Sequence, residues 1–342
     1  MNTRNPLFDL VKGLAMYMVI YWHVMSYRPG FELLATPSYA ANFIIIVNMP
    51  LFFMVSGYFS HRVHEMGDWR RFVNRIIKYF WPIAVFSVVI AVTECICTQN
   101  CLVSEIPVWV LKKFLFHNWF FYALAGCDII TFFAYKFGRQ TMGICVFCSI
   151  CFLACLLVSR IVWHTSNIVA MLPFYWFGLV LLPKVLRHRH VFVIFAVIGG
   201  VLMVVATYFL GNVAINGLGF YWDRFDIWNP EVDKIVHMIS RYTIGVLGSL
   251  FLIYCVKGLI EKIPGVASLA FLGTETLGVY ILQGNVIHYL SNQFVSLDAG
   301  SLMIFICGCG VFALSYGLVV VLKSNRWVKV CAFGRPIFLL KS

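Results

Sequence analysis

The sequence predicts an all-α, polytopic membrane protein with about ten transmembrane helices and both termini in the cytoplasm. Of its 342 residues, 61% are hydrophobic and only 12% are charged, whereas soluble domains carry roughly 25% charged residues. The mean hydropathy is +0.87. The apolar residues gather into runs of about 20, the length with which a helix crosses a bilayer. These observations exclude an ordinary water-soluble enzyme.

Each apolar run defines one expected span. The runs lie at 7–25, 39–59, 76–97, 116–136, 142–162, 167–184, 191–211, 236–257, 274–294 and 300–322. The longest connector, about 212–235, is too short for an independent domain, so we expect residues 1–342 to form a single transmembrane domain. The first run contains Asp9 and Lys12, which favours a retained span over a cleaved signal.

The charge distribution sets the expected orientation. The formal net charge is +12, which in a soluble protein would raise nucleic acid as a partner. Cytoplasmic loops collect Lys and Arg for a reason of their own. With the N-terminus inside, most basic residues fall on inner segments, and the outer side keeps few, such as Lys234 and Arg241. Membrane lipids are therefore the expected partner and nucleic acid is not. Lys112 and Lys113 fit a short interfacial helix at 108–114.

The cysteine pattern favours packing over metal chemistry. Most of the 12 Cys lie inside apolar runs, as in the stretch 145–155, where no polar side chain supports a metal or redox site. We therefore expect small packing residues and no metal. Cys95, Cys97 and Cys101 lie nearer a loop, and the sequence does not decide whether two of them form a disulfide.

The first span carries two residues that a bilayer tolerates poorly. Lys12 and His23 are eleven residues apart, so on a helix they lie on nearly the same face, about 16 Å apart along the axis. Taken singly, Lys12 fits a side chain that reaches the headgroups, and His23 fits the aromatic belt of a membrane interface. The shared face supports a functional role equally well, because His transfers protons near neutral pH.

The second span contains a proline, a small-residue pair and an amide. Pro50 removes a backbone hydrogen bond, and Ser56-Gly57 permits close helix approach, so packing explains these residues. Asn48 has a better claim to function, because an amide in mid-membrane needs partners.

A cationic stripe follows the second span. Arg71, Arg75 and Lys78 recur at i, i+4 and i+7, so their side chains share one helix face at the inner surface. The excess of positive charge on inner loops explains a basic segment but not this arrangement. Arginine's planar fork matches phosphate, and the stripe therefore indicates a phosphate-bearing cytoplasmic ligand.

Taken together, these segments resemble the acyltransferase-3 family of integral-membrane acyltransferases, in particular its sugar O-acetylase-like members. The resemblance covers nearly the whole chain in the right order. The matching elements are Lys12 with a ten-residue spacer and His23, Pro50 to Tyr58, Arg71 and Arg75 with Pro82, Trp119-Phe120, and Leu272-Gly273 to Tyr280 and Gln283.

Two positions depart from the family pattern. Asn48 and Gln283 stand where relatives often place His. Both side chains form hydrogen bonds but do not titrate, so neither can act as a general base. The chemistry is therefore expected to depend on His23.

The resemblance implies transfer of an acyl group, most simply acetyl, from cytoplasmic acetyl-CoA or another acyl-CoA to a hydroxyl of a sugar or cell-envelope polysaccharide. It also implies a bacterial-type inner membrane. His23 is the expected catalytic residue, either as general base or as a transient acyl carrier. The expected acyl-CoA-binding residues are Lys12, Arg71, Arg75 and Lys78. The expected supporting or acceptor-side residues are Asp9, Asn48, Ser56, Glu94, Trp119, Tyr280 and Gln283.

Three further points stay open on the sequence. The acids Asp9, Glu94 and Asp128 fit either charge balance at the site or, better, structural ion pairs. The outer segment 221–228 combines aromatic and acidic residues, which suits either sugar contact or an interfacial anchor. A transporter or flippase for a lipid-linked sugar or small solute is the rival function, although the paired repeats and matched broken helices of such carriers are not visible.

Overall fold

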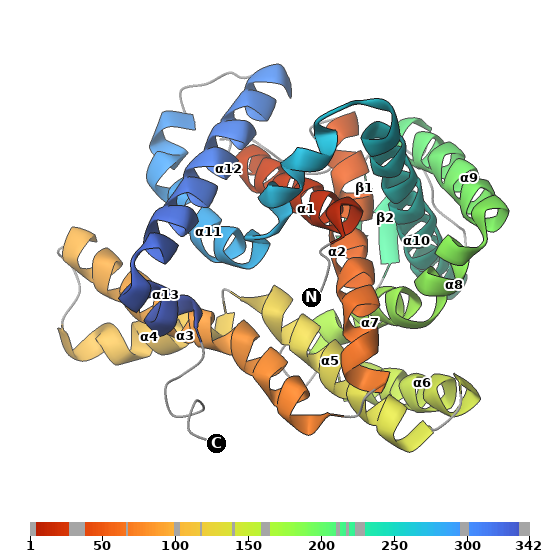
Figure 1. The fold of residues 1–342 in the computed structure, drawn as a ribbon, viewed down its shortest axis with the longest axis horizontal. Coiled ribbons are helices and arrows are strands. Elements are labelled where there is room, and N and C mark those ends of the chain that lie inside the picture. The colour runs from red at the N-terminus through yellow and green to blue at the C-terminus, as the bar shows by residue number, and fades with distance from the viewer. Residues whose placement is uncertain are drawn as a thin grey trace. The chain divides into compact units, whose positions relative to one another are not determined.

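The computed structural model describes residues 5–26, 38–65, 68–98, 103–116, 118–138, 141–158, 165–209, 213–216, 219–222, 230–294 and 301–334. Nearly all of these residues are helical (Figure 1), which confirms the all-α class. The elements are α1 (Pro6–Ser26), α2 (Tyr39–Glu65), α3 (Trp69–Thr98), η1 (Val103–Glu105), α4 (Ile106–Phe116), α5 (Trp119–Gly138), α6 (Thr141–Val158), α7 (Thr165–Trp176), η2 (Phe177–Leu181), α8 (Leu182–Arg187), α9 (Arg189–Tyr208), β1 (Val213–Asn216), β2 (Gly219–Trp222), α10 (Pro230–Lys262), η3 (Val266–Gly273), α11 (Thr276–Phe294), α12 (Ser301–Ser324) and α13 (Arg326–Phe333).

The described residues contain eight helices long and apolar enough to cross a membrane. The bent pair Val266–Gly273 and Thr276–Leu290, whose two halves meet at 70°, is either a broken ninth span or a re-entrant loop. The eight helices and the bent pair coincide with nine of the predicted runs. The remaining run, 142–162, corresponds to α6 and continues past the described residues. The chain is therefore a multi-pass membrane protein, as predicted.

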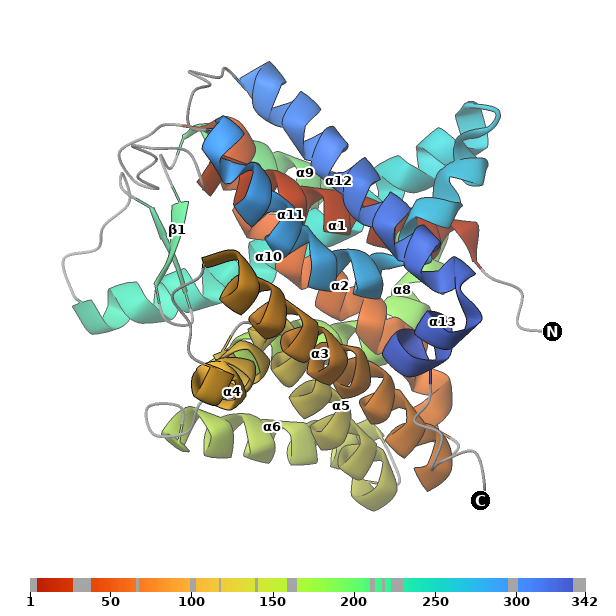
Figure 2. The same ribbon diagram turned by 90° about the vertical axis from the view of Figure 1, so that its left-hand side faces the viewer.

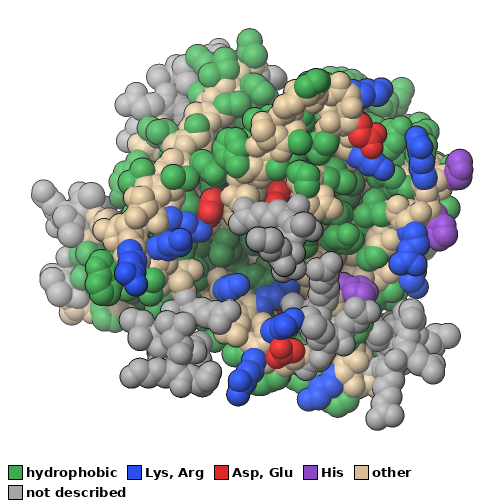
Figure 3. All heavy atoms as spheres, in the orientation of Figure 1, with side chains coloured by type: hydrophobic (Ala, Val, Ile, Leu, Met, Phe, Trp, Pro, Cys, Tyr) green, Lys and Arg blue, Asp and Glu red, His purple; other side chains and the backbone are tan. Residues whose placement is uncertain are grey.

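Apolar side chains on the outside of the helices fit a lipid environment. Along α12, Leu302, Ile306 and Val321 are exposed, and hydrophobic side chains reach the surface there in Figure 3. Soluble proteins seldom expose so much contiguous apolar surface. These faces are therefore the ones we expect to contact lipid.

The chain divides into two compact units, each described here by itself. Unit 1 comprises Met1–His61, Val169–Thr276 and Val286–Ala313. Unit 2 comprises Arg62–Ile168, Leu277–Asn285 and Leu314–Ser342.

Unit 1 is built on close backbone crossings. Helix α10 packs along α9 and against α1, and η3 packs along α1 (Figure 1). A side chain at Gly57 of α2 would collide with the carbonyl of Tyr175, and one at Gly178 would collide with the carbonyl of Met54. The backbones of α2 and the α7–η2 segment therefore touch. This confirms the close helix approach predicted for Ser56-Gly57.

Unit 2 is a layer of helices around α3 and α5. Helix α3 packs against α4, α5 and α13, and α5 lies beside α6 (Figure 2). Asp68 fixes the start of α3, because its Oδ1 accepts the backbone N–H groups of Arg70 at 3.0 Å and Arg71 at 3.2 Å. The short helix predicted at 108–114 is present as α4.

A small hairpin interrupts the helical pattern. Strands β1 and β2 pair antiparallel, with Val213 opposite Trp222 and Asn216 opposite Gly219, and β2 packs against α10. Hydropathy alone treats this stretch as a connector. Because Asn216 pairs with Gly219, the two loop positions are Gly217 and Leu218, and the sequence signal for the hairpin is a glycine at the first of them between two short apolar runs.

Candidate active site

His23 lies in the last turn of α1 and is half-buried. In the part of the chain that the structure describes, no hydrogen bond engages its ring. Its backbone carbonyl accepts the Ser26 hydroxyl at 2.9 Å. The imidazole therefore has a nitrogen available for a substrate proton.

Lys12 is held at the other end of α1. Its Nζ lies 2.6 Å from Asp9 Oδ1 and 5.1 Å from the centroid of the Phe59 ring. A side chain at Gly273 of η3 would collide with the Asp9 carbonyl. The first motif and the Leu-Gly part of the C-terminal motif therefore meet in unit 1, and the close approach explains the glycine.

The motif residues of the second span, on α2, mainly make packing contacts. Asn48 is buried, and its Oδ1 accepts the backbone N–H of Met49 at 2.6 Å. Ser56 stands next to the glycine at the α2–α7 crossing. The ring of Tyr58 stacks on Phe8, with centroids 4.3 Å apart.

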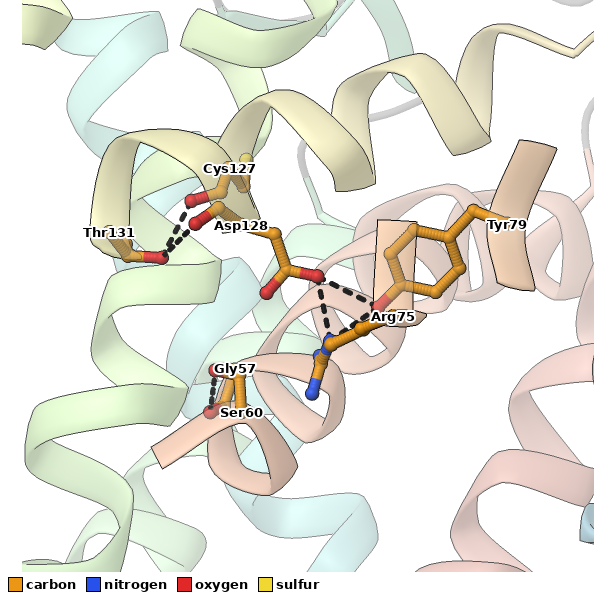
Figure 4. Close-up of polar contacts among 7 residues, drawn as sticks. All are labelled: Gly57, Ser60, Arg75, Tyr79, Cys127, Asp128 and Thr131. Atoms are coloured by element: carbon orange, nitrogen blue, oxygen red, sulfur yellow. Dashed lines mark hydrogen bonds and ion pairs between the residues drawn. The ribbon is translucent and has the colours of Figure 1, made fainter. Parts of the chain in front are cut away.

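Arg75 belongs to a buried network in unit 2 (Figure 4). Its Nε lies 2.7 Å from Asp128 Oδ2 and 2.7 Å from the Tyr79 hydroxyl, which donates to the same carboxylate oxygen at 2.8 Å. The Asp128 side chain is 0% exposed and that of Arg75 is 17% exposed. In the same stretch of α5, the Thr131 hydroxyl donates a hydrogen bond to the Cys127 carbonyl at 2.7 Å. The network fixes the guanidinium.

The other two members of the cationic stripe face solvent. Arg71 and Lys78 are exposed, and Arg71 Nε lies 3.1 Å from Asp68 Oδ2. The stripe thus presents two exposed cations, one on either side of the fixed Arg75.

All three acids left open on the sequence form ion pairs. Asp9 pairs with Lys12 and Asp128 with Arg75, and Glu94 Oε1 lies 2.7 Å from Lys113 Nζ. The structural ion-pair interpretation therefore describes each of them.

The last two motif segments meet in unit 2. The ring of Tyr280 stacks on Phe120 at 4.9 Å and meets Phe121 edge-on at 5.2 Å. Trp119, half-buried, meets the Phe120 ring edge-on at 6.3 Å. One turn beyond Tyr280, Gln283 is buried, and its Oε1 has no hydrogen-bond partner among the described residues.

The predicted site residues thus fall into two sets. Unit 1 holds Asp9, Lys12, His23, Asn48 and Ser56, and unit 2 holds Arg71, Arg75, Lys78, Glu94, Trp119, Tyr280 and Gln283. Sequence reasoning missed Tyr79, although its position four residues after Arg75 places both on one helix face. No three His, Cys, Asp or Glu gather as a metal site within the described ranges. Cys101 lies outside those ranges, as does the side chain of Cys97.

The fold and these motifs define a multi-pass membrane protein with ionisable groups fixed inside its helices. The family model described as an acyltransferase domain, acyltransferase 3, matches residues 5–320, nearly the whole chain. The chain therefore belongs to the acyltransferase-3 family and is a membrane acyltransferase. No curated protein and no solved structure gives a significant match.

Proposed function

We propose that this acyltransferase moves an acyl group, acetyl in the simplest case, from a cytoplasmic acyl-CoA to a hydroxyl of a sugar or cell-envelope polysaccharide. The expected location is a bacterial-type inner membrane. The observation that carries the proposal is His23, a titratable ring inside a membrane span whose nitrogens are not taken up by the described residues. Such a ring suits proton transfer from a hydroxyl.

Donor binding is assigned to the cations. Arg71 and Lys78 are exposed on the same helix as the fixed Arg75, and phosphate groups of coenzyme A match such a stripe. Lys12 is paired with Asp9, but an ammonium group has three donors. Lys12 therefore keeps N–H groups that can hydrogen-bond to an oxygen of the acyl-CoA.

The reaction has two routes that both need His23. In the first, His23 takes the proton of the acceptor hydroxyl, whose oxygen attacks the thioester carbonyl. The carbon–sulfur bond then breaks, and the departing thiolate is protonated. In the second, an imidazole nitrogen attacks the thioester carbonyl and the thiolate leaves and is protonated. The acceptor hydroxyl then attacks the acyl-histidine, the carbon–nitrogen bond breaks, and the freed imidazole takes the hydroxyl proton. Succinyl-CoA would use the same residues.

The test is transfer of labelled acetyl from acetyl-CoA to an envelope glycan extract by the purified protein. His23→Ala should abolish transfer while the protein still inserts into the membrane. The control is His190→Ala, an exposed histidine at the start of α9. Full transfer by His23→Ala would refute the catalytic role.

Mass spectrometry of envelope glycans with and without the protein identifies the acyl group. An added acetyl supports acetyl-CoA as donor, and an added succinyl identifies the longer donor. Movement of a lipid-linked sugar across the membrane with unmodified glycans would instead support the transporter.

A further inference from the structure

A second set of ionisable side chains lies in α10, apart from the residues already discussed. Asp233, His237 and Arg241 are spaced four residues apart, so they follow one face of the helix over about 12 Å. His237 is 5% exposed and Arg241 is 3% exposed. The side chain of Asp233 is 15% exposed. We refer to these three residues as the α10 ladder.

The α10 ladder is held in place locally. Asp233 Oδ1 lies 2.9 Å from His237 Nε2, and the Ser240 hydroxyl donates to the His237 carbonyl at 2.7 Å. Beside Arg241, the Tyr242 hydroxyl donates to the carbonyl of Val169 on α7 at 3.4 Å. This part of α10 is therefore tied to its neighbours.

The ladder lies at the His23 end of unit 1. The chain leaves the far end of α10 and enters η3, whose Gly273 packs against Asp9 near the start of α1. Because α10 also packs against α1, the two helices run in opposite directions. The beginning of α10 is thus level with the end of α1, and Figure 2 shows the hairpin beside that beginning.

Ionisable groups inside a membrane span are costly and mark a substrate path by default. Lys12 and Asp9 occupy the opposite end of α1, where the donor is expected. The ladder occupies the end that the loop charges place outside, where an envelope acceptor is met. Arg241 presents its donors in a planar fork, a geometry that suits a carboxylate or phosphate.

We propose that the α10 ladder is an acceptor subsite for a sugar bearing an anionic group, a carboxylate or a phosphate. Arg241 binds the anion, and the Asp233–His237 pair positions the hydroxyl-bearing ring beside it. The assignment of this ligand as the acceptor rests on the proposed function, whereas binding of the anionic sugar is measurable without catalysis.

Equilibrium binding of three soluble probes to the purified full-length protein tests the subsite. The probes are methyl glucoside, methyl glucuronoside and glucose 1-phosphate, which are neutral, carboxylate-bearing and phosphate-bearing. The wild type should bind at least one anionic probe about 10-fold more tightly than the neutral one, because charge-assisted hydrogen bonds are the stronger ones. The tighter of the two identifies the anion.

Variants separate the ladder from general damage to the fold. Arg241→Met should remove the preference for the anionic probe and leave the neutral Kd unchanged, and Arg241→Lys should restore part of the preference. Glu261→Gln is the matched control, since Glu261 and Lys257 are an exposed i, i+4 pair at the other end of α10, 3.9 Å apart. It should change nothing.

Two results would overturn the subsite: equal Kd values for all three probes in the wild type, or an anion preference that survives Arg241→Met. Failure of acetyl transfer with intact anion binding would instead refute the proposed function and leave the subsite standing. The two proposals therefore fail separately.

Discussion

Asp128→Asn removes a charge from the buried network of unit 2 while keeping the size of the side chain. The carboxylate is 0% exposed and accepts hydrogen bonds from Arg75 and Tyr79. Removing one partner of a buried ion pair costs about 3–5 kcal/mol, because the other charge stays buried. The Arg75 side chain retains 17% exposure, so water compensates part of this loss. We therefore expect a loss near the lower end, ~3 kcal/mol.

The single variant measures this loss, and a double-mutant cycle measures how much of it depends on the Arg75–Asp128 pair. The four proteins are the wild type, Asp128→Asn, Arg75→Gln and the double variant, compared by thermal unfolding in detergent. Because the two side chains interact directly, the double variant should be less destabilised than the sum of the single variants, by at least ~1 kcal/mol. The control is Glu261→Gln, whose exposed pair should contribute about 0–1 kcal/mol. Additive effects, or a change below ~0.5 kcal/mol for Asp128→Asn, would refute the reasoning.

Two more variants test donor binding and helix packing. Arg75→Ala should mainly raise the KM for acetyl-CoA in the transfer assay, whereas Arg70→Ala, an exposed neighbour, should not; equal KM values would argue against the phosphate site. Gly273→Ala should lower the unfolding temperature and the yield of folded protein, because the new methyl group collides with the Asp9 carbonyl. Gly284→Ala, which meets nothing within 4 Å, is its control, and an equally stable Gly273→Ala would contradict the close contact of η3 with α1.

The helical spans could be predicted from the sequence because a bilayer imposes one length and one composition on every crossing. The Lys12–Asp9 pair also follows from local spacing, since residues three apart meet on a helix. The Arg75–Asp128 pair could not be predicted, because the two residues are 53 apart and only the packing of α3 against α5 selects the partner. A buried acid does, however, call for a cation.

The β1–β2 hairpin and the burial of Arg241 could not be predicted from hydropathy and loop charge, for different reasons. The β1–β2 hairpin is short, and its signal is turn chemistry rather than hydropathy. The distribution of loop charges places Arg241 on the outer side of the membrane, yet this residue is only 3% exposed within α10. Loop-charge rules say on which side a residue stands, but burial depends on the helices that surround it.

The 70° bend between η3 and α11 constrains where water can reach. A broken helix leaves backbone groups that hydrocarbon cannot satisfy, so such a break must be enclosed by protein or wetted. Thr274 satisfies one of them, since both its amide and its hydroxyl donate to the Phe271 carbonyl, at 3.0 and 2.8 Å. The neighbouring Gly273 lies against Asp9, the partner of Lys12. The Asp9–Lys12 ion pair therefore lies beside a stretch of chain that lipid cannot cover, so this end of α1 must be enclosed by protein or reached by water.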